Sequence, residues 1–246
     1  MKARPDSLER VDLDVEHCRQ CPRLVAYGAT VARERRRAFA DQTYWARPVA
    51  GFGDPAARVL LVGLAPAAHG AHRTGRMFTG DRSGDFLFAA LHRAGLASAP
   101  ESRHRDDGLR LRGVYLTASA RCAPPDNRPS PAEFARCRPF LLRELALLPG
   151  VRVIVALGRL AHQQLLLGLG LRAALFAFAH GREHDLGRWH LLDCYHPSQQ
   201  NTFTGRLTPA MLDAVLQQAR ALAELRTESG GKARRLTAAG PRQRPK

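Results

Sequence analysis

The chain has 246 residues, 45% of them hydrophobic, which is enough for one substantial core and too few to require two domains. No apolar run approaches the roughly 20 residues that a membrane helix needs, and residues 1–10 are charged, unlike a secretory signal. We therefore expect one soluble, cytoplasmic domain over residues 1–228 that makes no contact with a membrane.

The charge of the chain is strongly positive, with 38 Lys and Arg against 22 Asp and Glu, a net charge of +16. Residues 230–246 hold six of the basic residues and no acid, so the rest of the chain still carries +10. Such an excess is most often used to release counterions from phosphates. We expect a nucleic acid as the partner, and a basic, disordered tail over residues 229–246.

In chain order, residues 24–39 predict a basic helix, and residues 58–64 predict a short buried strand that ends in Ala-Pro. Strands alternating with helices predict an α/β fold of three layers, α/β/α, with a central, mainly parallel sheet. The further predicted strands are 111–117, 151–157 and 189–195, and the further predicted helices are 83–96, 131–148, 159–167 and 209–225.

Three polar or glycine-rich loops follow the predicted strands, over residues 63–84, 121–131 and 196–207. In open parallel sheets, ligands bind outside the carboxyl ends of the strands. We therefore expect the three loops to meet at one edge of the sheet and to form the functional site there.

The five cysteines are an odd number in a chain without a secretory signal, which argues against structural disulfides. Cys18 and Cys21 form a C-x2-C pair, whereas Cys122 and Cys137 lie further apart. Four thiolates suit zinc or an iron–sulfur cluster, and the loose second pair favours the cluster over a zinc ribbon. Buried free thiols are the alternative. Cys194 lies within a predicted strand and is interpreted as a core residue.

The loop motifs closely resemble those of the type-5 branch of the uracil-DNA glycosylase superfamily. The matching motifs, together with the order of four cysteines, are GLAPAAHG at 63–70, RTGRMFTGD at 73–81, RCAPP at 121–125 and HPSQQNTFTGRL at 196–207. The resemblance spans nearly the whole folded chain. It implies a uracil-DNA glycosylase-like fold and a monomer associated with the nucleoid. It also implies hydrolytic excision of uracil, and of bases such as hypoxanthine, from DNA in base excision repair, leaving an abasic site.

The resemblance also assigns a cofactor and a base pocket. It implies a four-iron, four-sulfur cluster on the cysteines 18, 21, 122 and 137. A glycosylase must hold the extruded base in a fitted pocket, and the family implies that Phe78 stacks on it, where a core Phe is the alternative. His196 is expected to contact the uracil carbonyl and to stabilise the anionic leaving base. Other branches of the superfamily place a carboxylate or amide in the first loop to orient water. This chain has Ala65 there instead, so no general base is available at that position.

Further candidates for a catalytic role are Asp81, His72 and Asn127. Asp81 precedes a predicted helix and is equally interpreted as its cap. His72 stands where the family pattern has Asn or Asp, which leaves its role in positioning water open. Asn127 either binds the Watson–Crick edge of the base or stabilises a proline-rich turn.

The DNA-binding candidates are basic and polar loop residues. Arg73, Arg76 and Arg206 are expected to bind phosphate, and solvated surface arginines are the alternative. The third loop has no bulky apolar residue in its first part, so we expect a polar segment to enter the duplex. Its residues are Ser198, Gln199, Gln200 and Asn201.

Two other classes of protein compete with excision. A non-catalytic, iron–sulfur DNA-binding protein would explain the charge and the cysteines. Such a protein has no need for a glycine-rich loop with Phe78 and a His-Pro-Ser loop with His196 at the same edge of the sheet. A small-molecule α/β enzyme is disfavoured, because GLAPAAHG matches neither the dinucleotide fingerprint nor a P-loop. The motifs therefore favour a glycosylase.

Overall fold

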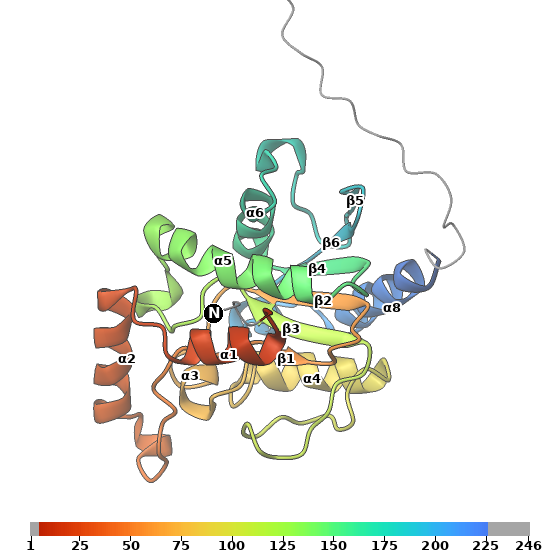
Figure 1. The fold of residues 1–246 in the computed structure, drawn as a ribbon. Coiled ribbons are helices and arrows are strands. Elements are labelled where there is room, and N and C mark those ends of the chain that lie inside the picture. The colour runs from red at the N-terminus through yellow and green to blue at the C-terminus, as the bar shows by residue number, and fades with distance from the viewer. Residues whose placement is uncertain (1–4, 226–246) are drawn as a thin grey trace, which may run out of the picture.

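The computed structural model describes residues 5–225, and the tail expected over residues 229–246 lies outside this range. Its centre is a six-stranded sheet with the strand order β1-β3-β2-β4-β6-β5 (Figure 1). The strands are β1 (Phe52–Gly53), β2 (Val59–Gly63), β3 (Val114–Ala118), β4 (Val153–Leu157), β5 (Glu183–Asp185) and β6 (His190–Cys194).

The four inner strands, β3, β2, β4 and β6, are parallel, and the two edge strands are antiparallel to their neighbours. The predicted α/β class and the mainly parallel sheet are therefore confirmed. β1 and β5 escaped prediction because strands of two or three residues leave no periodic pattern. From β2 the chain moves to β3 on one side, and it then returns to the other side of β2 to form β4 and β6. The strand order therefore reverses between β2 and β4, and sheets of this kind bind ligands at such a point.

Helices cover both faces of the sheet. They are α1 (Leu8–Glu16), α2 (Pro22–Glu34), α3 (Ala71–Thr74), α4 (Arg82–Arg93), α5 (Pro131–Leu147), α6 (Arg159–Gly168), α7 (Gln199–Phe203) and α8 (Pro209–Leu225), with single 3-10 turns at η1 (Arg37–Phe39), η2 (Pro125–Asn127) and η3 (Ala173–Leu175). No helix within the described residues is both long and apolar enough to cross a membrane.

The core is divided by the sheet, because successive side chains of a strand point to opposite faces. Leu61 and Val155 belong to the apolar cluster that includes residues of α4 and α8. Leu60 and Ile154 belong to the cluster that includes residues of α5 and α6. The two pairs of helices therefore lie on opposite faces of the sheet, which is the three-layer arrangement expected from the sequence.

Two predicted segments differ from the structure. The basic helix expected over residues 24–39 ends at Glu34, because Arg35 adopts a left-handed backbone with φ of 43°. The third loop, expected to be irregular, contains the short helix α7, whose first turn is capped by the Ser198 hydroxyl.

Candidate active site

The three loops meet at the carboxyl edge of the sheet and surround a cavity of about 1030 Å³. The first loop follows β2, the second follows β3 and the third follows β6. The convergence expected from the strand order is therefore present. The predicted site residues that line the cavity are Ala65, Phe78, Asp81, Asn127, His196, Ser198, Gln199 and Gln200.

Phe78 is held in place by two glycines and by its own backbone, which has a φ of 53°. A Cβ on Gly63, the last residue of β2, would lie 2.8 Å from Phe78 Cζ. A Cβ on Gly84 would lie only 1.8 Å from the Phe78 carbonyl oxygen. Position 84 therefore requires glycine, and a larger residue at position 63 would displace the ring. Together the two glycines seat the half-buried Phe78 ring in the wall of the cavity.

His196 faces the same cavity, two residues after the end of β6. Burial lowers its pKa to about 4, although the nearby Asp81 carboxylate favours the charged form. The ring is therefore neutral at pH 7 and, within residues 5–225, has no hydrogen-bond partner. Its centroid lies 6.0 Å from that of Phe78, so both rings can reach one bound base.

Asp81 forms a helix cap and also lines the cavity. Its Oδ1 accepts a hydrogen bond from the Gly84 N–H at 3.0 Å, at the start of α4. Its second oxygen lies against Gly70, where an added Cβ would be 2.1 Å away. The cap interpretation is correct, and the same side chain lines the cavity.

Asn127 and Ala65 complete the wall. Asn127 and its neighbour Asp126 both adopt left-handed backbones, with φ of 54° and 53°, a conformation that Asn tolerates better than most residues. Ala65 presents no polar group to the cavity and packs against the apolar cluster that contains Phe134 and Cys137. The first loop therefore rests on the segment that carries one of the four cysteines.

His72 lies outside this cavity, contrary to its predicted role. Its ring is buried against Gly28, and its Nε2 lies 3.1 Å from the Gly28 carbonyl oxygen. A Cβ on Gly28 would lie 2.8 Å from the ring. His72 therefore joins α2 to the first loop and is not placed to position a water molecule in the cavity.

Arg73 and Arg76 are also buried, which disagrees with both interpretations of them, as phosphate ligands and as solvated surface residues. Arg73 donates to the carbonyl oxygens of His69 and Gly80, at 2.8 and 2.7 Å. Arg76 forms an ion pair with Asp107 at 2.5 Å. The sequence around these two arginines does not predict their burial, because the burial depends on segments that are distant in the chain.

The polar residues of the third loop have divided roles. Ser198 caps α7 by accepting from the Asn201 N–H at 3.4 Å, and the Asn201 side chain donates to the His196 carbonyl oxygen at 2.9 Å. These two residues therefore hold His196. Arg206 is exposed above the Tyr195 ring, 4.6 Å from its centroid, and is available to a phosphate.

The third loop also carries a large exposed aromatic residue that the sequence analysis missed. Phe203 ends α7 with 69% of its surface exposed, and the Arg82 guanidinium lies 5.2 Å from its ring centroid. Gln199 and Gln200, in the polar first part of the loop, are exposed at the rim, and Phe203 lies beyond the residues that the expectation covered.

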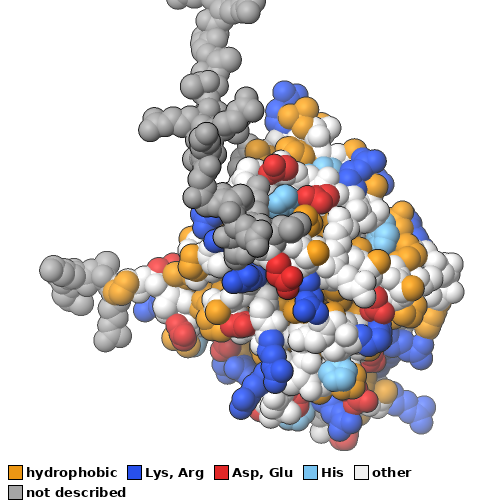
Figure 2. All heavy atoms as spheres, turned by 90° about the vertical axis from the view of Figure 1, so that its right-hand side faces the viewer, with side chains coloured by type: hydrophobic (Ala, Val, Ile, Leu, Met, Phe, Trp, Pro, Cys, Tyr) orange, Lys and Arg blue, Asp and Glu red, His pale blue; other side chains and the backbone are white. Residues whose placement is uncertain are grey.

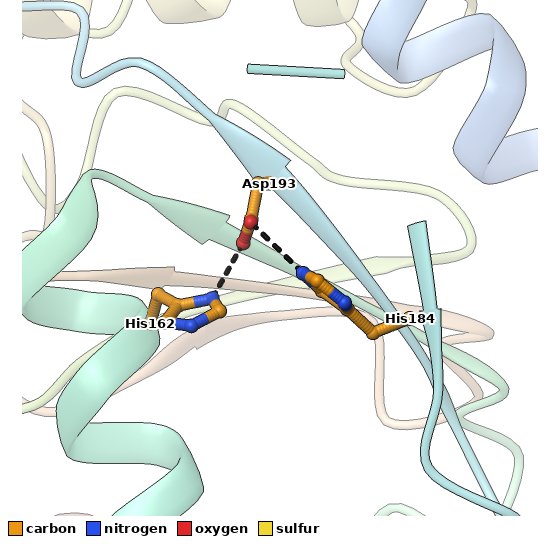
Figure 3. Close-up of side chains that lie close together, drawn as sticks. All are labelled: His162, His184 and Asp193. Atoms are coloured by element: carbon orange, nitrogen blue, oxygen red, sulfur yellow. Dashed lines mark hydrogen bonds and ion pairs between the residues drawn. The ribbon is translucent and has the colours of Figure 1, made fainter. Parts of the chain in front are cut away.

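A buried His–Asp–His cluster fastens the segment before β6 (Figure 3). His162 Nδ1 lies 2.7 Å from an Asp193 oxygen, and its Nε2 lies 2.8 Å from the Phe176 carbonyl oxygen. The ring is thereby held between oxygen atoms of two different segments of the chain. His184 Nε2 reaches the other Asp193 oxygen at 3.2 Å. These contacts have hydrogen-bond lengths and tie residues 176–184 to the strand that ends before His196.

Of the four cysteines expected to share a ligand, three lie close enough to Cys122 for their charges to act on its thiol. Burial raises the pKa of Cys122 to about 12, and the charges of Cys137, Cys18 and Cys21 contribute further. Cysteine thiolates are the donors that iron–sulfur clusters and structural zinc use. Cys194 lies in β6 and is fully buried in the apolar core, as expected.

Comparison with known proteins agrees with this fold. A model of the family described as "Uracil DNA glycosylase superfamily" matches residues 50–220. The chain is 58% identical to the type-5 uracil-DNA glycosylase of Thermus thermophilus over 209 residues, which are 85% of this chain and 94% of the relative. It is 54% identical to that of Mycobacterium leprae, over 88% of this chain and 96% of the relative. The chain therefore belongs to the uracil DNA glycosylase superfamily and to its type-5 branch.

Proposed function

We propose that this protein hydrolyses the N-glycosidic bond of uracil in DNA and leaves an abasic site, the first step of base excision repair. The observation that carries this proposal is the placement of a neutral, unpartnered imidazole and an aromatic ring on one cavity, 6.0 Å apart by their centroids. The names of the type-5 relatives support it.

The chemistry follows from these two side chains. Stacking on Phe78 holds the extruded base, while the bond to the sugar breaks toward an oxocarbenium ion and an anionic base. His196 donates a hydrogen bond to the base carbonyl as negative charge develops there, and such a donor is effective because it is already in position. Water then adds to the oxocarbenium carbon and loses a proton, which leaves the abasic sugar. Because burial keeps its pKa near 4, the ring donates as neutral imidazole and loses no proton in doing so.

The residues that line the cavity determine which bases can bind there. Ala65 supplies no polar group and no general base, so leaving-group stabilisation is the main contribution of the protein. Asn127, which lines the cavity, would bind the Watson–Crick edge of the base. A wall without a polar group at Ala65 excludes larger deaminated bases less firmly, and we extend the proposal to hypoxanthine. The enzyme would act as a monomer at the nucleoid.

The four cysteines support a second part of the proposal, a four-iron, four-sulfur cluster. Cys18 and Cys21 flank the turn between α1 and α2, whereas Cys122 follows β3 and Cys137 lies in α5. A cluster on these thiolates would join the first two helices to the second loop and serve as a structural crosslink. The wild type should be brown with broad visible absorbance, which Ser at Cys18 and Cys21 should abolish. A colourless protein that contains zinc would refute the cluster.

The activity is tested with labelled oligonucleotides that contain uracil, hypoxanthine, xanthine or no lesion, followed by alkaline cleavage at abasic sites. Strand breaks are expected only at lesions. Replacing one donor to a developing oxyanion costs about 10²- to 10³-fold in rate, so His196→Ala should slow single-turnover excision by that factor and leave DNA binding nearly intact. Binding without any excision by the wild type would instead favour the non-catalytic iron–sulfur protein.

A further inference from the structure

A second hollow of about 650 Å³ lies beside the base cavity. Residues 42–47 and 103–106 form its sides, and four of its lining residues are arginines. By contrast, basic side chains on the face shown in Figure 2 are scattered among acidic and neutral ones. The arginines of the hollow are Arg47, Arg73, Arg103 and Arg105, and Asp106 is its acidic residue.

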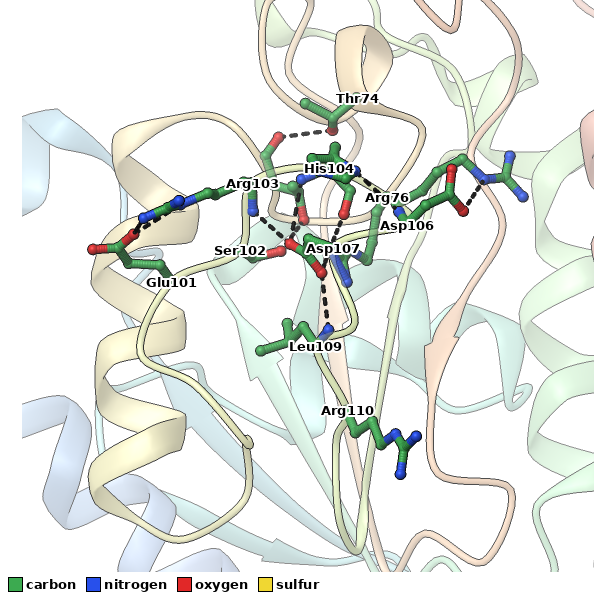
Figure 4. Close-up of polar contacts among 12 residues, drawn as sticks. Thr74, Arg76, Glu101, Ser102, Arg103, His104, Asp106, Asp107, Leu109 and Arg110 are labelled. Atoms are coloured by element: carbon green, nitrogen blue, oxygen red, sulfur yellow. Dashed lines mark hydrogen bonds and ion pairs between the residues drawn. The ribbon is translucent and has the colours of Figure 1, made fainter.

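The loop on one side of the hollow is organised by a buried ion pair (Figure 4). Arg76, only 3% exposed, pairs with Asp107 at 2.5 Å. The Asp107 carboxylate in turn accepts from the backbone N–H of Arg103 at 2.7 Å, and from that of Leu109 at 2.9 Å. Because this carboxylate is held by a buried arginine, the loop has a defined shape that presents Arg105 to the hollow. Arg103 also lines the hollow, but its guanidinium is paired with Glu101 at 2.7 Å.

Trp45 forms the platform between the arginines. The guanidinium carbon of Arg105 lies 4.2 Å from its ring centroid, and that of Arg47 lies 5.3 Å away. The indole is fixed by its hydrogen bond to the Pro48 carbonyl oxygen at 3.1 Å and by Gly75, which packs against it. Stacking on an aromatic ring orients a guanidinium and leaves its N–H edge free for an anion.

The two stacked arginines are weakly neutralised by the protein. Arg47 is exposed and contacts no carboxylate in the described part of the chain. Arg105 lies 3.5 Å from Glu16 and 3.9 Å from Asp106, both too long for strong charge-assisted hydrogen bonds. Trp45 itself is covered by these arginines and by Gly75, so little of its ring is free to stack on a nucleobase. The hollow therefore suits a phosphate group better than a base.

Arg73 connects the hollow with the base cavity. It donates to the carbonyl oxygens of His69 and Gly80, both of which line the cavity, and it also lines the hollow. Its hydrogen bonds go to neutral oxygens, so among residues 5–225 no carboxylate contacts this buried charge. Its positive field therefore acts on both spaces.

We propose that this hollow binds a phosphodiester group of the lesion-containing strand, next to the extruded nucleotide. The proposal rests on the excision activity proposed above. The lesion strand is chosen over its complement because Arg73 is common to both spaces and the extruded nucleotide is continuous with its own strand. The hollow would thereby fix the register of the strand, since phosphate contacts position a protein on DNA without carrying sequence information.

The test uses single-stranded uracil oligonucleotides with one methylphosphonate, an uncharged phosphate analogue, moved stepwise along the strand. For the wild type, the dissociation constant should rise about tenfold at one or two positions flanking uracil. Arg47→Ala and Arg105→Ala should each bind more weakly and become insensitive at those positions, and each lost phosphate contact should flatten the slope of log affinity against log salt by about 0.7. Arg110→Ala is the matched control, because Arg110 is exposed at the far end of the same loop and does not line the hollow.

Three outcomes would overturn the proposal. The first is equal sensitivity of Arg47→Ala and wild type at every flanking position. The second is a defect that appears with duplex but not with single-stranded substrate, which would assign the hollow to the complementary strand. The third is an equal loss of affinity in Arg110→Ala, which would indicate general charge. Wild-type excision of the unmodified oligonucleotide is measured in parallel, so failure of the proposed activity is seen separately.

Discussion

Replacing Gly63 with Ala should displace the aromatic ring of the pocket without unfolding the protein. The new Cβ would lie 2.8 Å from Cζ and 2.9 Å from Cε2 of Phe78. Carbon atoms pack best at about 3.5–4.0 Å, so the ring must retreat by about 1 Å. The Phe78 backbone cannot follow easily, because its carbonyl lies against Gly84. A misplacement of about 1 Å can cost about 100-fold in rate, and we expect that loss in Gly63→Ala.

The assay is single-turnover excision of uracil from an oligonucleotide, paired with urea denaturation of the same preparation. Overpacking of this kind costs about 1–3 kcal/mol, which a domain with a typical stability of about 5–15 kcal/mol survives. We therefore expect a folded variant with a slow chemical step. A folded Gly63→Ala variant that excises uracil at the wild-type rate would refute the role of the Phe78 ring position.

A double-mutant cycle separates the ring from other effects of the new methyl group. Phe78→Ala removes the ring, so Gly63→Ala should add little to the loss in that background. If Gly63→Ala still lowers the excision rate about 100-fold in the Phe78→Ala background, the effect of the methyl group does not pass through the Phe78 ring. Gly84→Ala is the contrasting case, because its Cβ would meet the backbone oxygen of Phe78 at 1.8 Å, and we expect it to disrupt the fold of the loop.

Two further predictions concern buried charge. The folded-state pKa of His196 lies near 4, whereas an unfolded His has a pKa of about 6.5. Between these values the unfolded chain binds more protons, so the free energy of unfolding should fall as the pH drops from about 6.5 to 4. Urea denaturation at pH 7 and pH 5 should therefore show a smaller fall for His196→Asn than for the wild type. Glu144 pairs with Arg121 at 2.6 Å, and both are almost fully buried. Glu144→Gln should therefore cost about 3–5 kcal/mol by thermal denaturation, and replacing both partners with apolar residues of similar size should recover much of it.

The inner strands and the place of the site were predictable from the sequence for a physical reason. Parallel strands buried on both faces are continuous apolar runs, and their carboxyl ends bring the following loops together. The motifs then identified Phe78 and His196 as the facing side chains. His72 was not predictable in this way, because its burial depends on the space left by Gly28. Phe203 was missed because exposure of an aromatic residue at the end of a short helix has no local signature.

The burial of Arg73 and Arg76 changes how the first-loop motif contributes to DNA binding. An arginine in a glycine-rich loop of a basic protein suggests a direct phosphate contact, but both guanidiniums are used within the protein. Arg76 organises the 103–109 loop through Asp107, so its effect on DNA is indirect, through the arginines of that loop. Arg73 lies between the base cavity and the second hollow and acts through its charge. Substitution of Arg76 should accordingly lower stability as well as affinity, whereas substitution of Arg47 should lower affinity alone, and measuring both quantities on the two variants distinguishes the two kinds of arginine.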